Sequence, residues 1–256
     1  MGLIYMARIE LDCVTVDIPI IAGHSLSLKG SLSTLTQNLL TSGGRGEPRT
    51  LTALRDLSLI IEDGDRVGLI GLNGSGKSTL LRVLAGIYEP TGGEVRVSGQ
   101  TNALIDLALG FDLEATGYEN IMLRGYMLGM TFSAMTRLVP DVAAFTELGD
   151  RLNDPIRTYS AGMMLRLAFA TSLMCPHDIL LLDEVIGVGD AAFISKAISR
   201  LTSVVEQSRI VVLASHALEL IQGICNKAIY LRGGRIAAVG AVGETVSCYQ
   251  RDLANG

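Results

Sequence analysis

The order of hydrophobic and polar positions predicts a strand near the amino-terminal end of the chain. Residues 7–18 (ARIELDCVTVDI) alternate apolar and polar side chains and are rich in Val and Ile, as a strand with one buried face is. Two later runs, 178–184 and 209–216, are almost continuously apolar, which is typical of strands buried on both faces. The other predicted strands are two within 51–72, joined by a turn at Asp63-Gly64-Asp65, one at 92–99, and a hairpin at 228–240 through Gly233-Gly234.

Helical spacing appears between these strands. Leu28, Leu32, Leu35 and Leu39 recur at spacings of four, three and four, which places them on one face of a helix. Residues 104–158 have helical patterns and no clear strand. Further helices are predicted at 78–87, 161–174 and 243–253, and a Gly- and Pro-containing loop at 41–50. Strands and helices that alternate in this way predict an α/β fold.

Composition narrows the class of protein. The chain has 256 residues, 48% of them hydrophobic, so it is long enough for a large core. Its net charge is −5, whereas proteins that bind nucleic acids usually carry an excess of positive charge, so we expect no nucleic-acid partner. No run reaches the roughly 18 apolar residues that a membrane-spanning helix needs. Four distant cysteines without metal-ligand spacing predict reduced thiols in a cytosolic protein: Cys13, Cys175, Cys225 and Cys248.

One glycine-rich stretch, GLNGSGKST, carries the strongest chemical signal. It satisfies the phosphate-loop pattern G-x-x-x-x-G-K-[ST], in which backbone N–H groups and a helix N-terminus converge on a phosphate. An ordinary glycine-rich turn is the alternative, but a strand before it and a helix after it favour the phosphate loop. We expect Lys77 to reach the β and γ phosphates and Ser78 to offer its hydroxyl to Mg²⁺. The predicted nucleotide-binding residues are Gly71, Leu72, Asn73, Gly74, Ser75, Gly76, Lys77, Ser78 and Thr79.

Two acidic residues follow the buried strand at 178–184. Asp183 is suited to hold the magnesium ion, directly or through water, and Glu184 to act as general base on an attacking water. Two charges where a strand meets solvent are the alternative. Beside a phosphate loop, the catalytic interpretation is favoured.

A second helix start lies between the loop and the acidic strand. Ser160 can cap the helix at 161–174, and Gly162 lets the backbone approach an anion. Taken alone, the stretch is a plain N-cap. Its sequence, Ser-Ala-Gly-Met, resembles the Ser-Gly-Gly-Gln signature motif of ABC ATPases, and it has the order expected there, 83 residues after Lys77 and 23 before Asp183.

The resemblance implies a fold and further residues. It implies a P-loop NTPase core of the ABC ATPase type with an N-terminal antiparallel β subdomain and an inserted helical subdomain, divided at 1–103, 104–158 and 159–256. It also implies that Asp190 is a D-loop aspartate and that His216, 33 residues after Asp183, is a switch histidine that contacts the γ-phosphate. In the family, two ATP molecules are held in a head-to-tail dimer, so Ser160 and Gly162 would bind the nucleotide of a second copy.

Departures from the general family pattern indicate a subgroup. Ser-x-Gly-Met, a Leu-Gly-Phe stretch before Thr-Gly-x-Glu-Asn, and Val-Gly-Asp after the acidic pair resemble the ATPases that export O-antigen, teichoic acid and related polysaccharides. Residues 103–125 lack the Q-loop glutamine, for which Asp106, a carbonyl near Gly110 or water would substitute. Ile18 lies near the expected adenine position and offers only apolar contact. The leucine stripe at 28–39 fits either the core or an amphipathic insertion of this subgroup near the membrane.

The sequence therefore predicts the ATP-binding and ATP-hydrolysing subunit of an exporter that moves a lipid-linked glycan. We expect ATP and Mg²⁺ as cofactors, a second copy of the chain and a membrane-embedded permease as partners, and a peripheral place on the cytoplasmic face of the bacterial inner membrane. We expect no appended carbohydrate-binding domain. The alternatives are an ABC exporter for another lipid or a peptide, an ABC ATPase without a membrane partner, and a P-loop kinase or GTPase.

Overall fold

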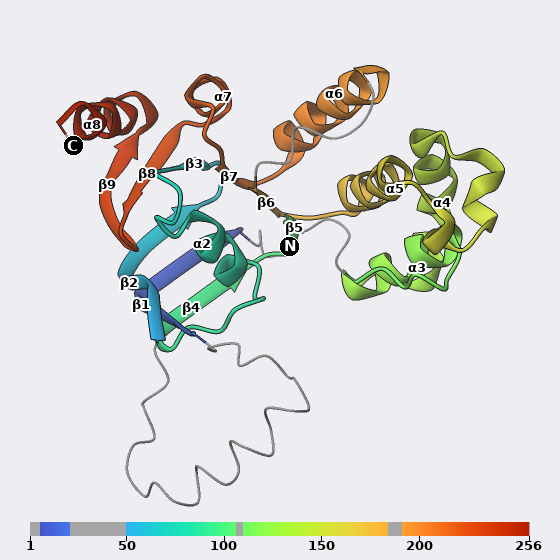
Figure 1. Ribbon diagram of the computed structural model, residues 1–256, viewed down its shortest axis with the longest axis horizontal. Coiled ribbons are helices and arrows are strands. Elements are labelled where there is room, and N and C mark those ends of the chain that lie inside the picture. The colour runs from blue at the N-terminus through green and yellow to red at the C-terminus, as the bar shows by residue number, and fades with distance from the viewer. Residues whose placement is uncertain (1–5, 21–49, 106–109, 184–190, 256) are drawn as a thin grey trace, which may run out of the picture.

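Figure 1 shows a computed structural model of the chain, which describes residues 6–20, 50–105, 110–183 and 191–255. Several of the predictions above fall outside these residues. They are the leucine-lined helix at 28–39, the loop at 41–50 except its last residue, and the roles given to Asp106, Glu184 and Asp190.

A six-stranded sheet forms the centre of the molecule. Its strand order is β5-β6-β7-β3-β8-β9, and all neighbours run parallel except β8 and β9, which form the predicted hairpin. The central strands are buried along almost their whole length, which explains their continuous apolar sequences. The strands are β3 (Arg66–Ile70), β5 (Thr101–Leu104), β6 (Ile179–Asp183), β7 (Ile210–Ala214), β8 (Lys227–Arg232) and β9 (Arg235–Ala241).

A second, antiparallel sheet has the order β2-β1-β4. Its strands are β1 (Arg8–Pro19), β2 (Thr50–Glu62) and β4 (Gly92–Ser98). The pairing of β1 with β2 shifts register beside Cys13, which has a φ of 49° and is exposed. The alternating burial of β1 agrees with the pattern read from its sequence, because one face packs on the core and the other faces solvent.

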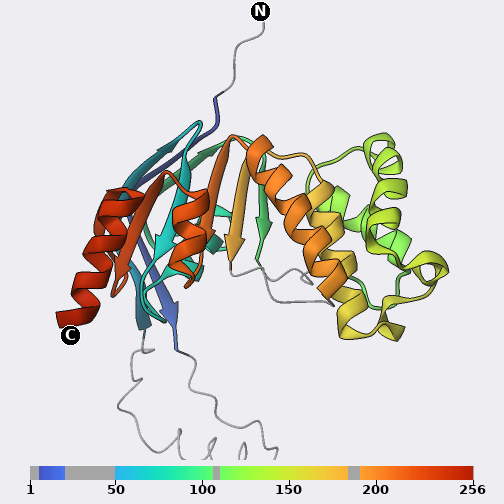
Figure 2. The same cartoon turned by 90° about the horizontal axis from the view of Figure 1, so that it is seen from above.

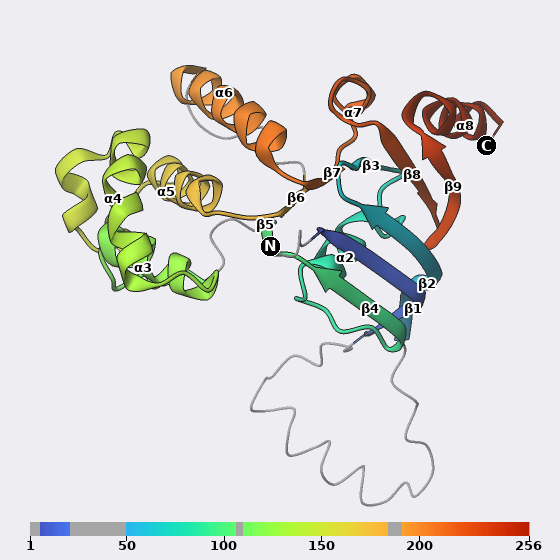
Figure 3. The ribbon, with the colours of Figure 1, turned by 180° about the vertical axis from the view of Figure 1, so that it is seen from behind.

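Helix α2 (Lys77–Leu84) lies between the two sheets, as the opposite views of Figures 1 and 3 show. Alternate residues of β6 separate the two hydrophobic cores. Leu181 packs in the core with α2 and the antiparallel sheet, whereas Leu180 and Leu182 pack in the core on the other face. That second face is covered by α6 (Ala191–Gln207), α7 (Leu218–Ile224) and α8 (Val242–Asn255).

A helical region extends from the β5 end of the central sheet (Figure 2). Its first helix begins with a capping box, in which the Thr116 hydroxyl accepts from the Glu119 N–H and the Glu119 carboxylate accepts from the Thr116 N–H. The elements are α3 (Gly117–Met127), α4 (Phe132–Thr146), two 3₁₀ turns (Gly149–Asn153 and Ile156–Thr158) and α5 (Ala161–Met174).

Ionic contacts fix the edge of the sheet at which β3 begins. Asp65, 7% exposed, accepts hydrogen bonds from the Glu62 N–H at 2.9 Å and from the Lys227 ammonium at 2.7 Å. Arg209 pairs with Asp63 in the same turn. The predicted turn at 63–65 therefore joins β2 to β3 and also ties β3 to its neighbours in the sheet.

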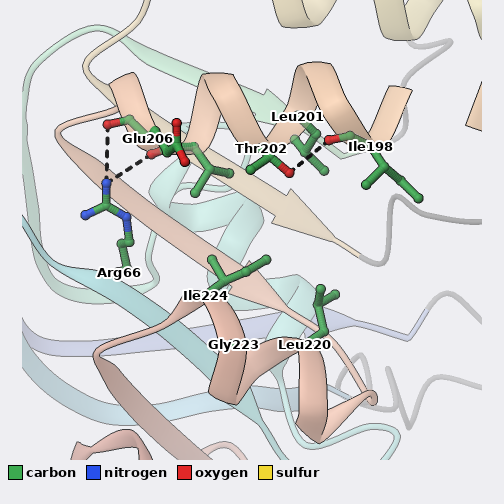
Figure 4. Close-up of a pocket in the computed structure, with 9 residues that line it drawn as sticks. Arg66, Ile198, Leu201, Thr202, Glu206, Leu220, Gly223 and Ile224 are labelled. Carbon is green, nitrogen blue, oxygen red and sulfur yellow. Dashed lines mark hydrogen bonds between the residues drawn. The ribbon is translucent and has the colours of Figure 1, made fainter. Parts of the chain in front are cut away.

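Arg66, the first residue of β3, fixes the carboxyl end of α6. Its guanidinium donates to the Val205 carbonyl at 3.2 Å and to the Glu206 carbonyl at 3.3 Å, as Figure 4 shows. These carbonyls lie in the last turn of a helix, where a cation is favourable. A cavity of about 330 Å³ separates α6 from α7 beside this contact.

The predicted strands and helices within the described residues are confirmed, with three additions. No strand was predicted at β5, which has only four residues and crosses the predicted boundary between residues 103 and 104. Helices α6 and α7 were also not predicted. The division at 1–103, 104–158 and 159–256 stays a prediction.

Candidate nucleotide-binding site

The phosphate loop lies where three parallel strands end. In the sheet, Ala214 of β7 pairs with Leu69 of β3 on one side and with Asp183 of β6 on the other. The loop follows β3 directly, Asp183 is the last residue of β6, and His216 stands two residues after β7. Residues far apart in the sequence therefore meet at the carboxyl edge of the sheet, where α/β proteins bind their ligands.

Two glycines of the loop have no space for a side chain. A Cβ on Gly71 would lie 2.3 Å from the Leu231 carbonyl oxygen, and one on Gly76 would lie 2.8 Å from Cδ2 of Leu54. Both residues also have positive φ values, 148° and 108°, which disfavour other amino acids. The glycine pattern that predicted a cradle is thus required by the tight wrapping of the loop against its neighbours.

The loop orients its lysine. The Lys77 ammonium donates to the Gly71 carbonyl at 2.8 Å and to the Leu72 carbonyl at 3.2 Å, and the residue is only 7% exposed. These bonds hold the cation inside the loop that it closes. A phosphate in this loop would meet both the ammonium and the backbone N–H groups around it.

The start of α2 has no side-chain cap. Its N-cap residue, Gly76, has no hydroxyl or carboxylate to offer, so the first N–H groups of the helix need another acceptor. Ser75 is 5% exposed, and its buried hydroxyl has no hydrogen-bond partner among the described residues. An anion fits both features, because a helix N-terminus favours negative charge.

A cavity of about 310 Å³ brings several of the predicted residues together, but Gly71, Leu72 and Ser75 of the loop are not among the described residues that line it. Its lining includes Lys77, Ser78 and Asp183, and hydroxyl and carboxylate oxygens are suitable Mg²⁺ ligands. Ile18 and Leu51 add apolar side chains to the lining. The described residues that line it are Ile18, Leu51, Thr52, Ala53, Asn73, Gly74, Gly76, Lys77, Ser78, Thr79, Asp183, His216 and Gly234.

The signature residues lie on a different surface. The Ser160 hydroxyl accepts from the Met163 N–H at 3.3 Å, so it caps α5 as predicted. Ser160 and Ala161 are exposed and Gly162 is half-buried. Neither Ser160 nor Gly162 is among the described residues that line the cavity. The structure of one chain therefore does not bring them to its own phosphate loop.

Sequence reasoning missed the support that the hairpin gives to the loop. The Gly234 N–H donates to the Ser75 carbonyl at 3.1 Å, and the Gly234 carbonyl accepts from the Arg55 N–H at 2.7 Å. Gly234 also lines the cavity. The glycine pair at 233–234 predicted the turn, but nothing in its sequence indicated which loop the turn would contact.

Other chemically versatile residues have structural surroundings. Both ring nitrogens of His177 are bonded, to the Cys175 carbonyl at 2.9 Å and the Ser208 hydroxyl at 3.0 Å, and burial lowers the pKa of His177. Burial raises the pKa of Cys175 to about 11 and that of Cys225 to about 12. These two thiols are therefore protonated near neutral pH.

Comparison with protein families now adds to this geometry. The family model described as ABC transporter matches residues 54–187, a little over half of the chain, including the loop and Asp183. This chain belongs to the ABC transporter family. The match confirms the resemblance that the signature and phosphate loop indicated.

Relatives of this ABC transporter chain are similar over most of its length. It is 44% identical over 231 residues to the O-antigen export system ATP-binding protein RfbE of Yersinia enterocolitica, covering 90% of this chain and 97% of the relative. It is 36% identical to the O-antigen export system ATP-binding protein RfbB of Myxococcus xanthus, covering 95% of this chain but 57% of the relative. It is 41% identical to the teichoic acids export ATP-binding protein TagH of Listeria monocytogenes, covering 77% of this chain and 58% of the relative.

Solved structures have the same fold. The ATP-binding cassette MJ0796, described as dimeric and bound to ADP and Pi after hydrolysis, aligns with a TM-score of 0.66 at 21% identity, covering 91% of this chain and 98% of that one. An ATP-binding subunit of an ABC transporter aligns with a TM-score of 0.69 at 19% identity, covering 94% and 93%. These similarities confirm the predicted ABC ATPase architecture of an α/β core with an antiparallel sheet and a helical region.

Among the described residues, no helix combines the length and the apolar character needed to cross a bilayer.

Proposed function

We propose that this chain is the ATP-binding and ATP-hydrolysing subunit of an exporter that moves a lipid-linked polysaccharide across the bacterial cytoplasmic membrane. One observation carries the proposal: Lys77, Ser78, Asp183 and His216 line a single cavity in a chain that is 44% identical to an O-antigen export subunit over nearly that relative's full length. Cargoes of the O-antigen or teichoic-acid kind agree with the names of the relatives.

In the proposed mechanism the loop residues 71–79 hold the ATP phosphates through backbone N–H groups. Lys77 exchanges its two carbonyl contacts for the β and γ phosphates. Ser78 and Asp183 would hold Mg²⁺, which would neutralise charge on the phosphates. Glu184 accepts a proton from the attacking water, and His216 orients the γ-phosphate. Phosphoryl transfer needs mainly positioning and electrostatic stabilisation, which these residues provide.

Two copies complete each nucleotide site in this proposal. Ser160 and Gly162 are accessible in one chain and lie outside its own cavity, so they are available to the nucleotide of a partner. The solved cassette MJ0796, with a similar fold, is described as dimeric. Closure of two chains around two Mg-ATP then links nucleotide binding to a change of shape, and hydrolysis reopens the dimer.

The helical part of the chain, residues 104–158, transmits this motion to a membrane-embedded permease. Three large apolar side chains at the end of α3 and the start of α4 are exposed: Tyr126 at 47%, Met127 at 60% and Phe132 at 66%. Exposed apolar residues gathered at one place indicate a protein contact. The subunit would then lie peripherally on the cytoplasmic face of the inner membrane, with the lipid-linked glycan passing through its partner.

The nucleobase would rest on aliphatic side chains. Ile18 and Leu51 lie opposite each other on β1 and β2 and line the cavity beyond the phosphate loop. The sequence has no Phe, Tyr or Trp from Met6 to Ile87. Aliphatic contact supplies less base-specific attraction than stacking, so we expect affinity to depend mainly on the phosphates.

Two experiments test the function. Glu184→Gln in the purified chain should keep ATP binding and accumulate a stable dimer, measured by size-exclusion chromatography with light scattering. Hydrolysis at the parental rate would show that Glu184 is not the base.

In the native host, Lys77→Ala should leave polysaccharide on the inner face of the membrane, measured by surface labelling of the glycan. Normal surface glycan in a strain with no second copy of the gene would contradict the proposed cargo.

A further inference from the structure

Three helices meet in a cluster of aromatic rings and cations. The Phe193 ring of α6 lies edge-on to Phe145 of α4 at 5.7 Å and to Phe169 of α5 at 6.3 Å, between centroids. The Arg166 guanidinium carbon of α5 lies 4.9 Å from the Phe193 centroid, and the Lys196 ammonium of α6 lies 4.9 Å from the Phe145 centroid. Phe193 is 3% exposed, whereas Arg166 and Lys196 are half-buried, so the rings pack inside the molecule and the cations reach them from its surface.

The members of this cluster lie close in sequence to residues of the proposed nucleotide sites. Arg166 stands six residues after Ser160, which is about 9 Å along the same helix. Phe193 stands in the first turn of α6, three residues after Asp190 and nine after Glu184. One cation–ring contact thus joins the helix that begins with the signature residues to the helix that follows the proposed catalytic base.

We infer that the Arg166–Phe193 contact couples the two nucleotide sites of the dimer. This inference rests on the proposed function, in which Ser160 and Gly162 bind the partner's nucleotide while Glu184 acts on the chain's own. A movement of α5 upon binding the partner's phosphate shifts the guanidinium, and the ring carries the shift into the first turn of α6. Arg166 is a positioning residue in this scheme, because it acts through the Phe193 ring.

The contact is suited to such a role. A cation over a ring face is favoured only within about 6 Å and depends on the direction of approach, so displacement of α5 along its axis weakens it. The Phe169–Phe193 ring contact already packs α5 on α6, and the guanidinium therefore adds a directional element to this ring packing.

The neighbouring pair offers a matched control. Lys196 also places a cation over a ring and donates to the Phe145 carbonyl at 3.1 Å and to Glu147 at 2.7 Å, but it joins α6 to α4. It does not touch the signature helix through these contacts. Loss of Lys196 should therefore weaken packing without removing the connection between the two sites.

The test compares Arg166→Met, Phe193→Leu, their combination, Arg166→Lys and Lys196→Met in the purified full chain. Parental hydrolysis should depend on ATP concentration with a Hill coefficient of about 2, the limit for two sites. Arg166→Met and Phe193→Leu should each lower that coefficient to about 1 and the maximal rate on the order of tenfold. Binding of a fluorescent ATP analogue to the chain's own loop should not change, and Arg166→Lys should restore part of the cooperativity.

The combined variant distinguishes coupling from general damage. If the Arg166–Phe193 contact couples the two sites, the double variant Arg166→Met/Phe193→Leu should lose no more cooperativity and rate than the more severe single variant. Independent effects of the two substitutions would add. The inference is overturned by additive losses, by a parental Hill coefficient in folded Arg166→Met, or by an equal loss of cooperativity in Lys196→Met at matched melting temperature. A parental chain that hydrolyses ATP rapidly as a monomer with a Hill coefficient of 1 would instead contradict the proposed dimer.

Discussion

Helices α2 and α5 both begin at small or hydroxyl-bearing residues, yet their first turns are built differently. Helix α2 starts at Gly76 without a side-chain cap, and Lys77, Asp183 and His216 of the same chain line the cavity at its N-terminus. Helix α5 starts at Ser160, whose hydroxyl already caps it, and its first turn is exposed. The first arrangement is suited to hold an anion within one chain. The second does not line that cavity, and in the proposed function it serves the nucleotide of a partner.

The largest expected effect comes from mixing two inactive variants, one with a changed α2 start and one with a changed α5 start. Lys77→Ala should lower hydrolysis about a hundredfold or more, because the phosphates lose their cation, and Gly162→Glu should do the same by repelling the partner's nucleotide. When equal amounts of the two variants pair at random, half of the dimers contain one chain of each kind. In such a dimer, one site combines the intact loop of the Gly162→Glu chain with the intact signature turn of the Lys77→Ala chain. Hydrolysis should then recover measurably, to at most about a quarter of the parental rate because the intact site has no active partner site, measured by phosphate release.

Each variant mixed with itself is the control for that recovery. Absence of any recovery, in a mixture shown by crosslinking to contain mixed dimers, would mean that each chain uses its own Ser160 and Gly162. The difference between the two helix starts would then have no functional meaning.

A smaller change separates capping from ligand binding at α5. Ser160→Ala removes a cap, which costs about 1 kcal/mol of stability and lowers the melting temperature by about 2–4 °C. If Ser160 also binds the partner's phosphate, hydrolysis at 25 °C should fall at least about tenfold. The matched control is Thr131→Ala, which removes the corresponding cap of α4, where the hydroxyl accepts from the Ala134 N–H at 3.3 Å. Equal activity in both variants would leave Ser160 with a structural role only.

The stability of the strand that leads into the phosphate loop depends on contacts at its beginning, beside Asp65. Asp65→Ala leaves the Glu62 N–H without its acceptor and Lys227 without its partner, so we expect a loss of about 2 kcal/mol and a melting temperature lower by about 4–8 °C. Calorimetry measures both. Glu89→Ala, at an exposed acid after α2, should change the stability by less than about 0.5 kcal/mol. Similar values for the two variants would show that the ionic contacts of Asp65 contribute little.

The smallest expected effect is an increase in the affinity for ATP. Ile18→Tyr places a ring at the aliphatic end of the cavity, where it can stack on the base, so affinity for ATP should rise by about three- to tenfold. Parental affinities for ATP and GTP should differ by less than about threefold, measured by isothermal titration with Lys77→Ala as the blank. A strong parental preference for ATP would mean that residues other than Ile18 and Leu51 recognise the base.

Much of this site followed from sequence because its residues act through local backbone geometry. The Gly71–Lys77 spacing predicts the loop, and the apolar run ending at Asp183 predicts a buried strand whose last residue reaches the same edge of the sheet. Local pattern carries no information on which distant turn contacts the loop, and so the support from Gly234 was missed. Strand β5 was missed for a related reason: four residues are too few for alternation to appear, and its hydrogen bonds to β6 bridge 78 positions of sequence.

The place of β3 in the sheet also bears on how the protein is made. Its partners are β7 and β8, which begin at Ile210 and Lys227, and the turn that braces the phosphate loop lies at Gly234. A ribosome synthesises β3 long before any of these neighbours, so the emerging chain carries an incomplete loop until the turn at Gly234 has been released. The nascent protein thus gains the capacity to capture a nucleotide well after the loop itself has been made.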